Sequence, residues 1–234
     1  MKLTISIDSA TMTLVALAVD GTSDCETYNM NTGIAVAANL RQALASCRLL
    51  QNPRSYDRVS VCVDTPTQLV PIEEFSSEAA QPLFCAAMTL SAADEVATAR
   101  LDQLGVVAVF AVNRDLHFVL SENFRYVQFV PRIASTLAEC QEHAYGGFQE
   151  KLFCVFRGKA MDIVAFRKRR IRFCNSFTAE DTQDAVYFIM GVWQQLAMKP
   201  TDILCISGSP AEPATLDTKL RQFVKNVECG HSNK

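Results

Sequence analysis

The stretch LTISIDSATMTLVALAVDG, residues 3–21, contains two short apolar segments joined by a polar turn. Leu3, Ile5 and Ile7 alternate with polar residues, and this period of two predicts a strand with one buried face. A second strand is expected from Met12 to Val19. The turn between them, Asp8–Thr11, suits a phosphate-binding loop. It also suits an ordinary tight turn in which the aspartate hydrogen-bonds its own backbone.

The first half continues with a third strand, a helix and a fourth strand. Apolar residues at helical spacing run from Ile34 to Cys47, and Asn52-Pro53 is expected to end this helix. The segment PTQLVPIEEF, residues 66–75, carries two prolines and is expected to run along the surface. The other elements predicted here are strands at 26–30, 58–63 and 106–112, helices at 113–123 and 133–143, and an extended segment at 126–130.

The second half repeats the order of the first. Strands are predicted at 151–156, 160–166, 171–174 and 202–207, with a helix ending at Lys199-Pro200 and a last helix from about Thr215. Thr178 and Asp181 have the spacing of a capping box before the first of these helices. Both halves therefore predict a βββαβα unit. We expect an α/β protein with a first lobe at 1–147, which carries a surface insertion at about 66–104, and a second lobe at 148–234. A ligand is expected in the cleft between the lobes.

Composition and charge exclude several classes of protein. The 234 residues are 49% hydrophobic and 20% charged with a net charge of −3, which predicts a globular chain with no global drive toward nucleic acid or anionic membranes. No apolar run approaches the roughly 20 residues that cross a bilayer, so no membrane insertion is expected. The chain begins directly with a strand, which predicts no signal peptide. Its nine cysteines are scattered without a CxxC pair and predict free thiols in a cytoplasmic protein with no metal site.

The duplicated unit resembles the actin-like ATPase superfamily, whose members have a ribonuclease H-like fold and include actin and sugar kinases. More narrowly, the chain is similar to a family of uncharacterised Bacteroidetes proteins assigned to this fold. The residues that carry the likeness are LVPIEEF (69–75), FCNSFTAEDTQDAVYFIM (173–190) and LCISGS (204–209). The layout also resembles pilus-assembly and secretion-platform proteins. This second likeness implies a cytoplasmic lobe that docks another protein.

The resemblance also implies three nucleotide-binding signatures, and this chain departs from them. An Asp-x-Gly-Thr hairpin corresponds to residues 8–11, where Asp8 and Thr11 are kept and alanine replaces glycine. A second Asp-x-Gly turn corresponds to residues 156–159, where Phe156 replaces the aspartate and Gly158 is kept. A glycine-rich turn that contacts adenosine is partly matched by residues 207–209. The candidate nucleotide site is Asp8, Thr11, Gly158, Lys159, Ser207, Gly208 and Ser209.

The missing aspartate decides what this site is expected to do. Without a carboxylate at position 156, ordering a metal ion and an attacking water becomes difficult. Asp162 lies in the following strand, so we do not transfer the role to it. We therefore expect no catalytic residue, while binding of Mg²⁺-ATP without hydrolysis stays open.

A basic run, RKRRIR at residues 167–172, is the strongest local charge feature. Arg167, Lys168, Arg169, Arg170 and Arg172 are candidates for contact with an acidic partner, and the simpler alternative is a solvated hairpin. RNA binding is disfavoured, because no aromatic residues are interleaved to stack with bases. The three histidines show no metal-ligand spacing.

The sequence as a whole favours a non-catalytic interaction module that docks an unknown protein or a second copy of itself. The main alternative is an ATP-binding protein or weak ATPase that uses the cleft between the lobes. An RNA-associated protein is the third hypothesis.

Overall fold

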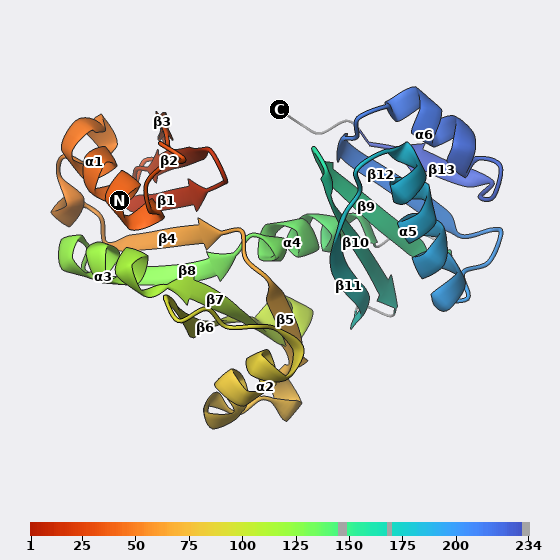
Figure 1. Ribbon diagram of the computed structural model, residues 1–234, viewed down its shortest axis with the longest axis horizontal. Coiled ribbons are helices and arrows are strands. Elements are labelled where there is room, and N and C mark those ends of the chain that lie inside the picture. Colours follow the sequence, from red (N-terminus) through yellow and green to blue (C-terminus); the bar gives the residue numbers. More distant parts are fainter. Residues whose placement is uncertain (145–148, 168–169, 231–234) are drawn as a thin grey trace. The chain divides into compact units, whose positions relative to one another are not determined.

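The computed structural model describes residues 1–144, 149–167 and 170–230, which form two compact units (Figure 1). The units comprise residues 1–134 and 135–234, so the division falls within helix α4 (Ile133–Ala144). The predicted lobe boundary, between residues 147 and 148, lies outside the described residues.

The first unit is built on a five-stranded sheet in the order β3-β2-β1-β4-β8. Strands β1 to β3 are antiparallel neighbours, whereas β4 and β8 run parallel to β1. The predicted alternation is confirmed, since Leu3 and Ile5 are buried in the core. The strands are β1 (Lys2–Ile7), β2 (Thr11–Leu17), β3 (Ser23–Asn29), β4 (Arg58–Val63) and β8 (Val127–Pro131), and helices α1 (Val36–Ser46) and α3 (Arg114–Asn123) contact each other.

The second unit has the same topology, with the order β11-β10-β9-β12-β13. Here β9 corresponds to β1 and again has an antiparallel neighbour on one side and a parallel neighbour on the other. The predicted duplication of the βββαβα unit is therefore confirmed. The elements are β9 (Lys151–Arg157), β10 (Ala160–Arg167), β11 (Arg170–Thr178), α5 (Thr182–Gln195), β12 (Ile203–Ser209), α6 (Pro213–Leu220) and β13 (Asn226–Cys229), the last of which was not predicted.

A separate three-stranded sheet, β5-β7-β6, lies within the first unit next to helix α2 (Ala80–Ala87) (Figure 1). Its strands are β5 (Thr67–Pro71), β6 (Asp94–Leu101) and β7 (Val106–Asn113). As expected, PTQLVPIEEF is mostly exposed or half-buried, but Thr67–Pro71 also pairs with β7 as an edge strand and Val70 is buried. Its two prolines precede and end the strand, where missing amide donors are tolerated.

Strand β7 joins two hydrophobic clusters. Ala108, Phe110 and Val112 lie in the main core of the first unit, whereas Val107 and Val109 pack with Phe84 of α2. Alternate residues of a strand point to opposite faces, so this uninterrupted apolar run is buried on both sides. Short 3-10 helices at Arg48–Leu50, Pro53–Ser55, Ile72–Glu74, Ser77–Ala79 and Asp102–Leu104 complete the unit.

The start of helix α5 corrects one prediction from the sequence. Asp181 is the N-cap, and its side chain accepts hydrogen bonds from the backbone amides of Gln183 and Asp184. Thr178 belongs to β11 instead. Thr178 and Asp181 have the spacing of a capping box, but Thr178 is the last residue of the edge strand β11. That strand is longer than its apolar residues indicate. None of the described helices is long and apolar enough to cross a membrane.

None of the nine cysteines forms a disulfide, and burial makes several of them poor nucleophiles. Burial raises the pKa of Cys140 to about 12 and that of Cys205 to about 11. We therefore expect alkylation of Cys205 by iodoacetamide to increase about tenfold per pH unit up to its pKa, because only the thiolate reacts. Labelling between pH 7 and 10 followed by mass spectrometry measures this. Labelling of Cys205 that is already complete at neutral pH would contradict its high pKa.

Candidate functional site

Three charged residues lie where the parallel strands of the first unit end. Asp8 follows β1, Asp64 follows β4, and Arg132 follows β8. The carboxyl ends of parallel strands meet at one edge of a sheet, which is where α/β proteins bind ligands. Arg132 lies 3.1 Å from Asp64, measured from Nε to Oδ1, and its backbone amide donates to the carbonyl of Val63. The sheet therefore fixes an Asp64–Arg132 pair beside the free end of β1.

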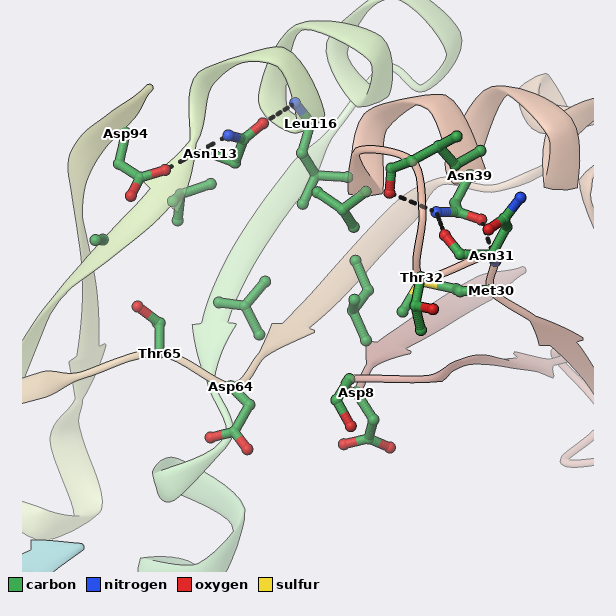
Figure 2. A pocket seen from close by; sticks show the side chains of 17 residues that line it. Asp8, Met30, Asn31, Thr32, Asn39, Asp64, Thr65, Asp94, Asn113 and Leu116 are labelled. Carbon is green, nitrogen blue, oxygen red and sulfur yellow. Dashed lines mark hydrogen bonds between the residues drawn. The ribbon is translucent and has the colours of Figure 1, made fainter. Parts of the chain in front are cut away.

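A pocket of about 460 Å³ opens at this edge (Figure 2). Asp8 and Asp64 line it from the sheet, and their side chains extend to the same side from neighbouring strand ends. The segment after β3 contributes Asn31 and Thr32, while Asp94 comes from β6. All these residues belong to the first unit, so the pocket is complete within it.

Two asparagines in the pocket wall have structural roles. The side-chain amide of the buried Asn39 accepts a hydrogen bond from the backbone amide of Asn31 and donates to the carbonyls of Asn31, Ile34 and Ala35. These bonds hold the segment after β3 against α1. Asn113 caps α3 by accepting from the amide of Leu116. Because these hydrogen bonds use both side chains, the carboxylates of Asp8 and Asp64 are the stronger candidates for contact with a ligand.

The turn after β1 is closed by its backbone. The amide of Asp8 donates to the carbonyl of Thr11 at 2.9 Å, and the amide of Met30 donates to the carbonyl of Ala10 at 2.8 Å. Residues 8–11 thus form the tight turn of the simpler alternative, while the Asp8 carboxylate has no hydrogen bond or ion pair within the described part of the chain. Thr11 begins β2 and does not line the pocket.

The charge of this pocket limits its ligands. Of the described residues that line it, three are aspartates (8, 64 and 94) and none is lysine or arginine. A bare phosphate would therefore be repelled, and a nucleotide needs a divalent cation between its phosphates and these carboxylates. No group of three or more His, Cys, Asp or Glu residues in the described ranges is arranged to hold a metal ion. Mg²⁺ is commonly held by one or two carboxylates together with phosphates, and Asp8 and Asp64 fit that role.

The hairpin between β9 and β10 holds the second signature. Phe156 is 4% exposed and belongs to the core of the second unit. Gly158 has a φ of 60° at the turn, a left-handed conformation that favours glycine. The hairpin thus keeps its shape, while the position of the expected aspartate is filled by a core side chain.

The two cations of this hairpin are bound within the second unit. The guanidinium of Arg157 lies 3.3 Å from the buried carboxylate of Asp162. Lys159 forms an ion pair with Glu180, and that hydrogen bond raises the pKa of the lysine. Because Glu180 already neutralises Lys159, a phosphate would have to displace that carboxylate.

The predicted residues of the second unit are only partly brought together. Gly158, Lys159 and Ser209 line a pocket of about 200 Å³ beside the start of α5, whose first amides are already capped by Asp181. Ser207 lines a different cavity, which contains Cys140 and Cys205. Gly208 has a φ of 83° where β12 passes the backbone of Phe156. This cap and the Lys159–Glu180 pair leave the pocket poorly equipped to bind an anion.

The basic run lies at the hairpin between β10 and β11, and Lys168 and Arg169 lie outside the described residues. Arg172 donates to Glu150 at 2.6 Å and to the carbonyl of Leu196. Arg167 lies 3.4 Å from the same glutamate. Arg172 thus holds β11 to the end of α5, whereas Arg170 is exposed. A role of the run in partner binding stays a prediction.

Reasoning from the sequence missed Asp64, although a signal was present. Asp64 comes directly after the apolar strand RVSVCV, and β4 lies parallel to β1. An acidic residue immediately after each of two parallel strands indicates paired carboxylates at one sheet edge. Asn39 and Asn113 have no such signal, because their roles depend on loops that the pattern does not specify.

Comparison with known proteins was consistent with this architecture. A model of the family described as "Protein of unknown function (DUF3822)" matches residues 1–227. A Bacteroides thetaiotaomicron protein with actin-like ATPase fold and unknown function is similar at a TM-score of 0.88 and 22% identity, over 98% of this chain and 90% of that one. A chain of the PilM-PilN type IV pilus biogenesis complex is similar at a TM-score of 0.56 and 13% identity, over 98% and 88%. No curated protein matches. The fold is thus the actin-like ATPase fold.

Proposed function

The chain belongs to this DUF3822 family, and we propose that it is a non-catalytic docking module that keeps the actin-like ATPase fold without nucleotide hydrolysis. Its partner is another protein or a second copy of itself. A cytoplasmic location is part of the proposal, because nine free thiols suit a reducing compartment.

The observation that carries the proposal is Phe156. Phosphoryl transfer to water needs charged groups that position a metal ion and the attacking water. The resemblance to actin-like ATPases implies a carboxylate at this turn, and the phenyl ring here is packed in the core instead. Asp162 does not replace that carboxylate, because it is fully buried and bound to Arg157 and Ser176.

A docking role is also supported by the likeness to a chain of the PilM-PilN complex. That structure is an assembly of proteins, so this fold occurs in a chain that binds another protein. At this low identity, only the fold can be inferred from the likeness. The partner of the present chain is inferred from the surface of this chain rather than from that complex.

Binding of Mg²⁺-ATP without hydrolysis is the second candidate function, and the free carboxylate of Asp8 favours it. Calorimetric titration with Mg²⁺-ATP, Mg²⁺-ADP and metal-free ATP tests it, with Asp8→Asn as the control. We expect no saturable heat at millimolar nucleotide, because Lys159 and the α5 amides that would hold phosphates are already occupied.

Saturable binding of Mg²⁺-ATP that is lost in Asp8→Asn and in metal-free ATP would instead establish a nucleotide site at the end of β1. Asn39→Ala is not a suitable control, because Asn39 holds the loop of the pocket. Thr65→Ala changes the wall of the same pocket without changing its charge. It therefore separates loss of the Asp8 charge from a general change in the pocket.

A further inference from the structure

A second pocket of the first unit lies at the amino-terminal ends of β4 and β8, whereas the candidate site lies at their carboxyl ends. Its volume is about 410 Å³. Arg58 at the start of β4 and Arg125 and Tyr126 before β8 line it, together with His117 and Ser121 of α3. The amide of Val59 donates to the carbonyl of Tyr126 at 2.8 Å, so the β4–β8 ladder fixes the position of the Tyr126 backbone.

The two arginines in this pocket have no anionic partner. Neither Arg58 nor Arg125 forms an ion pair within the described residues, and both are exposed. Two acidic residues near them already have partners, and Glu122, three residues before Arg125, forms no ion pair with either arginine in the described ranges. Asp57 binds the N-terminal ammonium at 2.7 Å, and Glu95 is hydrogen-bonded to His117. The pocket therefore presents two uncompensated guanidinium groups, which match a carboxylate in charge and in geometry.

Aromatic side chains make this surface suited to a peptide. Tyr126 is 58% exposed, and its ring lies 5.3 Å from the guanidinium carbon of Arg125, an arrangement that orients the arginine. Phe124 also lines the pocket. Tyr, Phe and Arg are the residue types that contribute most to protein interfaces.

We propose that this pocket, which we call the Arg58–Arg125 pocket, docks an acidic segment of a protein partner. A carboxylate of that segment binds between the two guanidinium groups, and an adjacent apolar side chain packs on Tyr126. The inference rests on the proposed docking function and names the chemistry of the partner.

A fluorescein-labelled peptide of alternating Glu-Glu and Tyr residues is the probe, and fluorescence anisotropy is the measurement. The same peptide with Gln in place of Glu is its uncharged control. We expect the acidic peptide to bind and the Gln peptide not to bind. In Arg58→Gln/Arg125→Gln we expect affinity to fall at least about tenfold, because two charge-assisted contacts are lost. The matched control is Arg41→Gln/Arg54→Gln, which removes two exposed arginines that do not line the pocket.

Three outcomes would overturn the proposal. They are absence of binding to the wild type, an equal loss in the two double variants, and displacement of the peptide by inorganic phosphate beyond that caused by chloride at equal ionic strength. The last would indicate a site for small anions. Circular dichroism of each variant checks that the fold is intact. The peptide assay contains no nucleotide. Failure of the peptide to bind would therefore refute the Arg58–Arg125 pocket alone, whereas hydrolysis of ATP by the protein would refute the proposed function.

Discussion

Replacement of Gly208 by alanine is expected to lower the free energy of unfolding of the second unit by roughly 3–5 kcal/mol, because added bulk and backbone strain combine. An added Cβ would lie 2.0 Å from the carbonyl oxygen of Phe156, which is a backbone atom and cannot rotate away. The φ of 83° at this position is also unfavourable for any residue with a side chain. Urea unfolding followed through the fluorescence of Trp193 measures the effect, since this single tryptophan is buried in the second unit.

Gly191→Ala is the matched control for this substitution. Gly191 lies within α5, and an added Cβ would meet nothing within 4 Å. Alanine there is expected to stabilise the helix by about 0.5–1 kcal/mol, since it favours the helical backbone. If Gly208→Ala leaves the unfolding midpoint unchanged or raises it, the close approach of β12 to Phe156 is wrong.

Asp162→Ala is expected to destabilise the second unit by about 3–5 kcal/mol, the usual result of removing one partner from a buried ion pair. Asp162 is fully buried and binds Arg157 from the hairpin. It also accepts from Ser176 of β11 at 2.6 Å and from Thr136 of α4 at 3.5 Å. Its loss would leave Arg157 without its buried carboxylate and weaken the attachment of α4 and β11. The same Trp193 measurement applies.

A surface pair provides the comparison for Asp162. Asp217 of α6 and Arg221, which directly follows that helix, lie four residues apart and form an ion pair of 2.7 Å. Asp217→Ala is expected to leave the unfolding midpoint nearly unchanged, because water and salt screen exposed pairs. A loss of stability no larger in Asp162→Ala than in Asp217→Ala would show that Asp162 does not organise the unit.

The sequence predicted most strands of the repeated unit because their apolar residues are buried. The alternation from Leu3 to Ile7 in this unit, and the apolar run from Val106 in the separate three-stranded sheet, depend on local burial, which a short window reveals. Strand β6 was missed because its eight residues, DEVATARL, contain one buried side chain. Strand β13 was missed because it has only four residues. Helix α2 was missed because Pro82 interrupts its pattern near the start.

The site was less predictable, because contacts between distant residues define it. The hairpin motif identified Asp8, and the replacement of an aspartate by Phe156 was visible from the likeness to actin-like ATPases. The ion pairs of the basic residues could not be predicted from the sequence. Lys159 pairs with Glu180, 21 residues away, and Arg172 pairs with Glu150, 22 residues away. The Arg58–Arg125 pocket likewise joins two segments that are far apart in the chain and become neighbours only through the β4–β8 ladder.

Single-turnover hydrolysis of Mg²⁺-ATP, with the protein in excess over the nucleotide, tests the central claim most directly. The phosphate released is compared for the wild type, Asp8→Asn and buffer alone. We predict the same rate in all three, because the hairpin that should position the attacking water carries a buried phenylalanine. Hydrolysis by the wild type that is faster than in buffer and lost in Asp8→Asn would contradict the account and identify the chain as an ATPase.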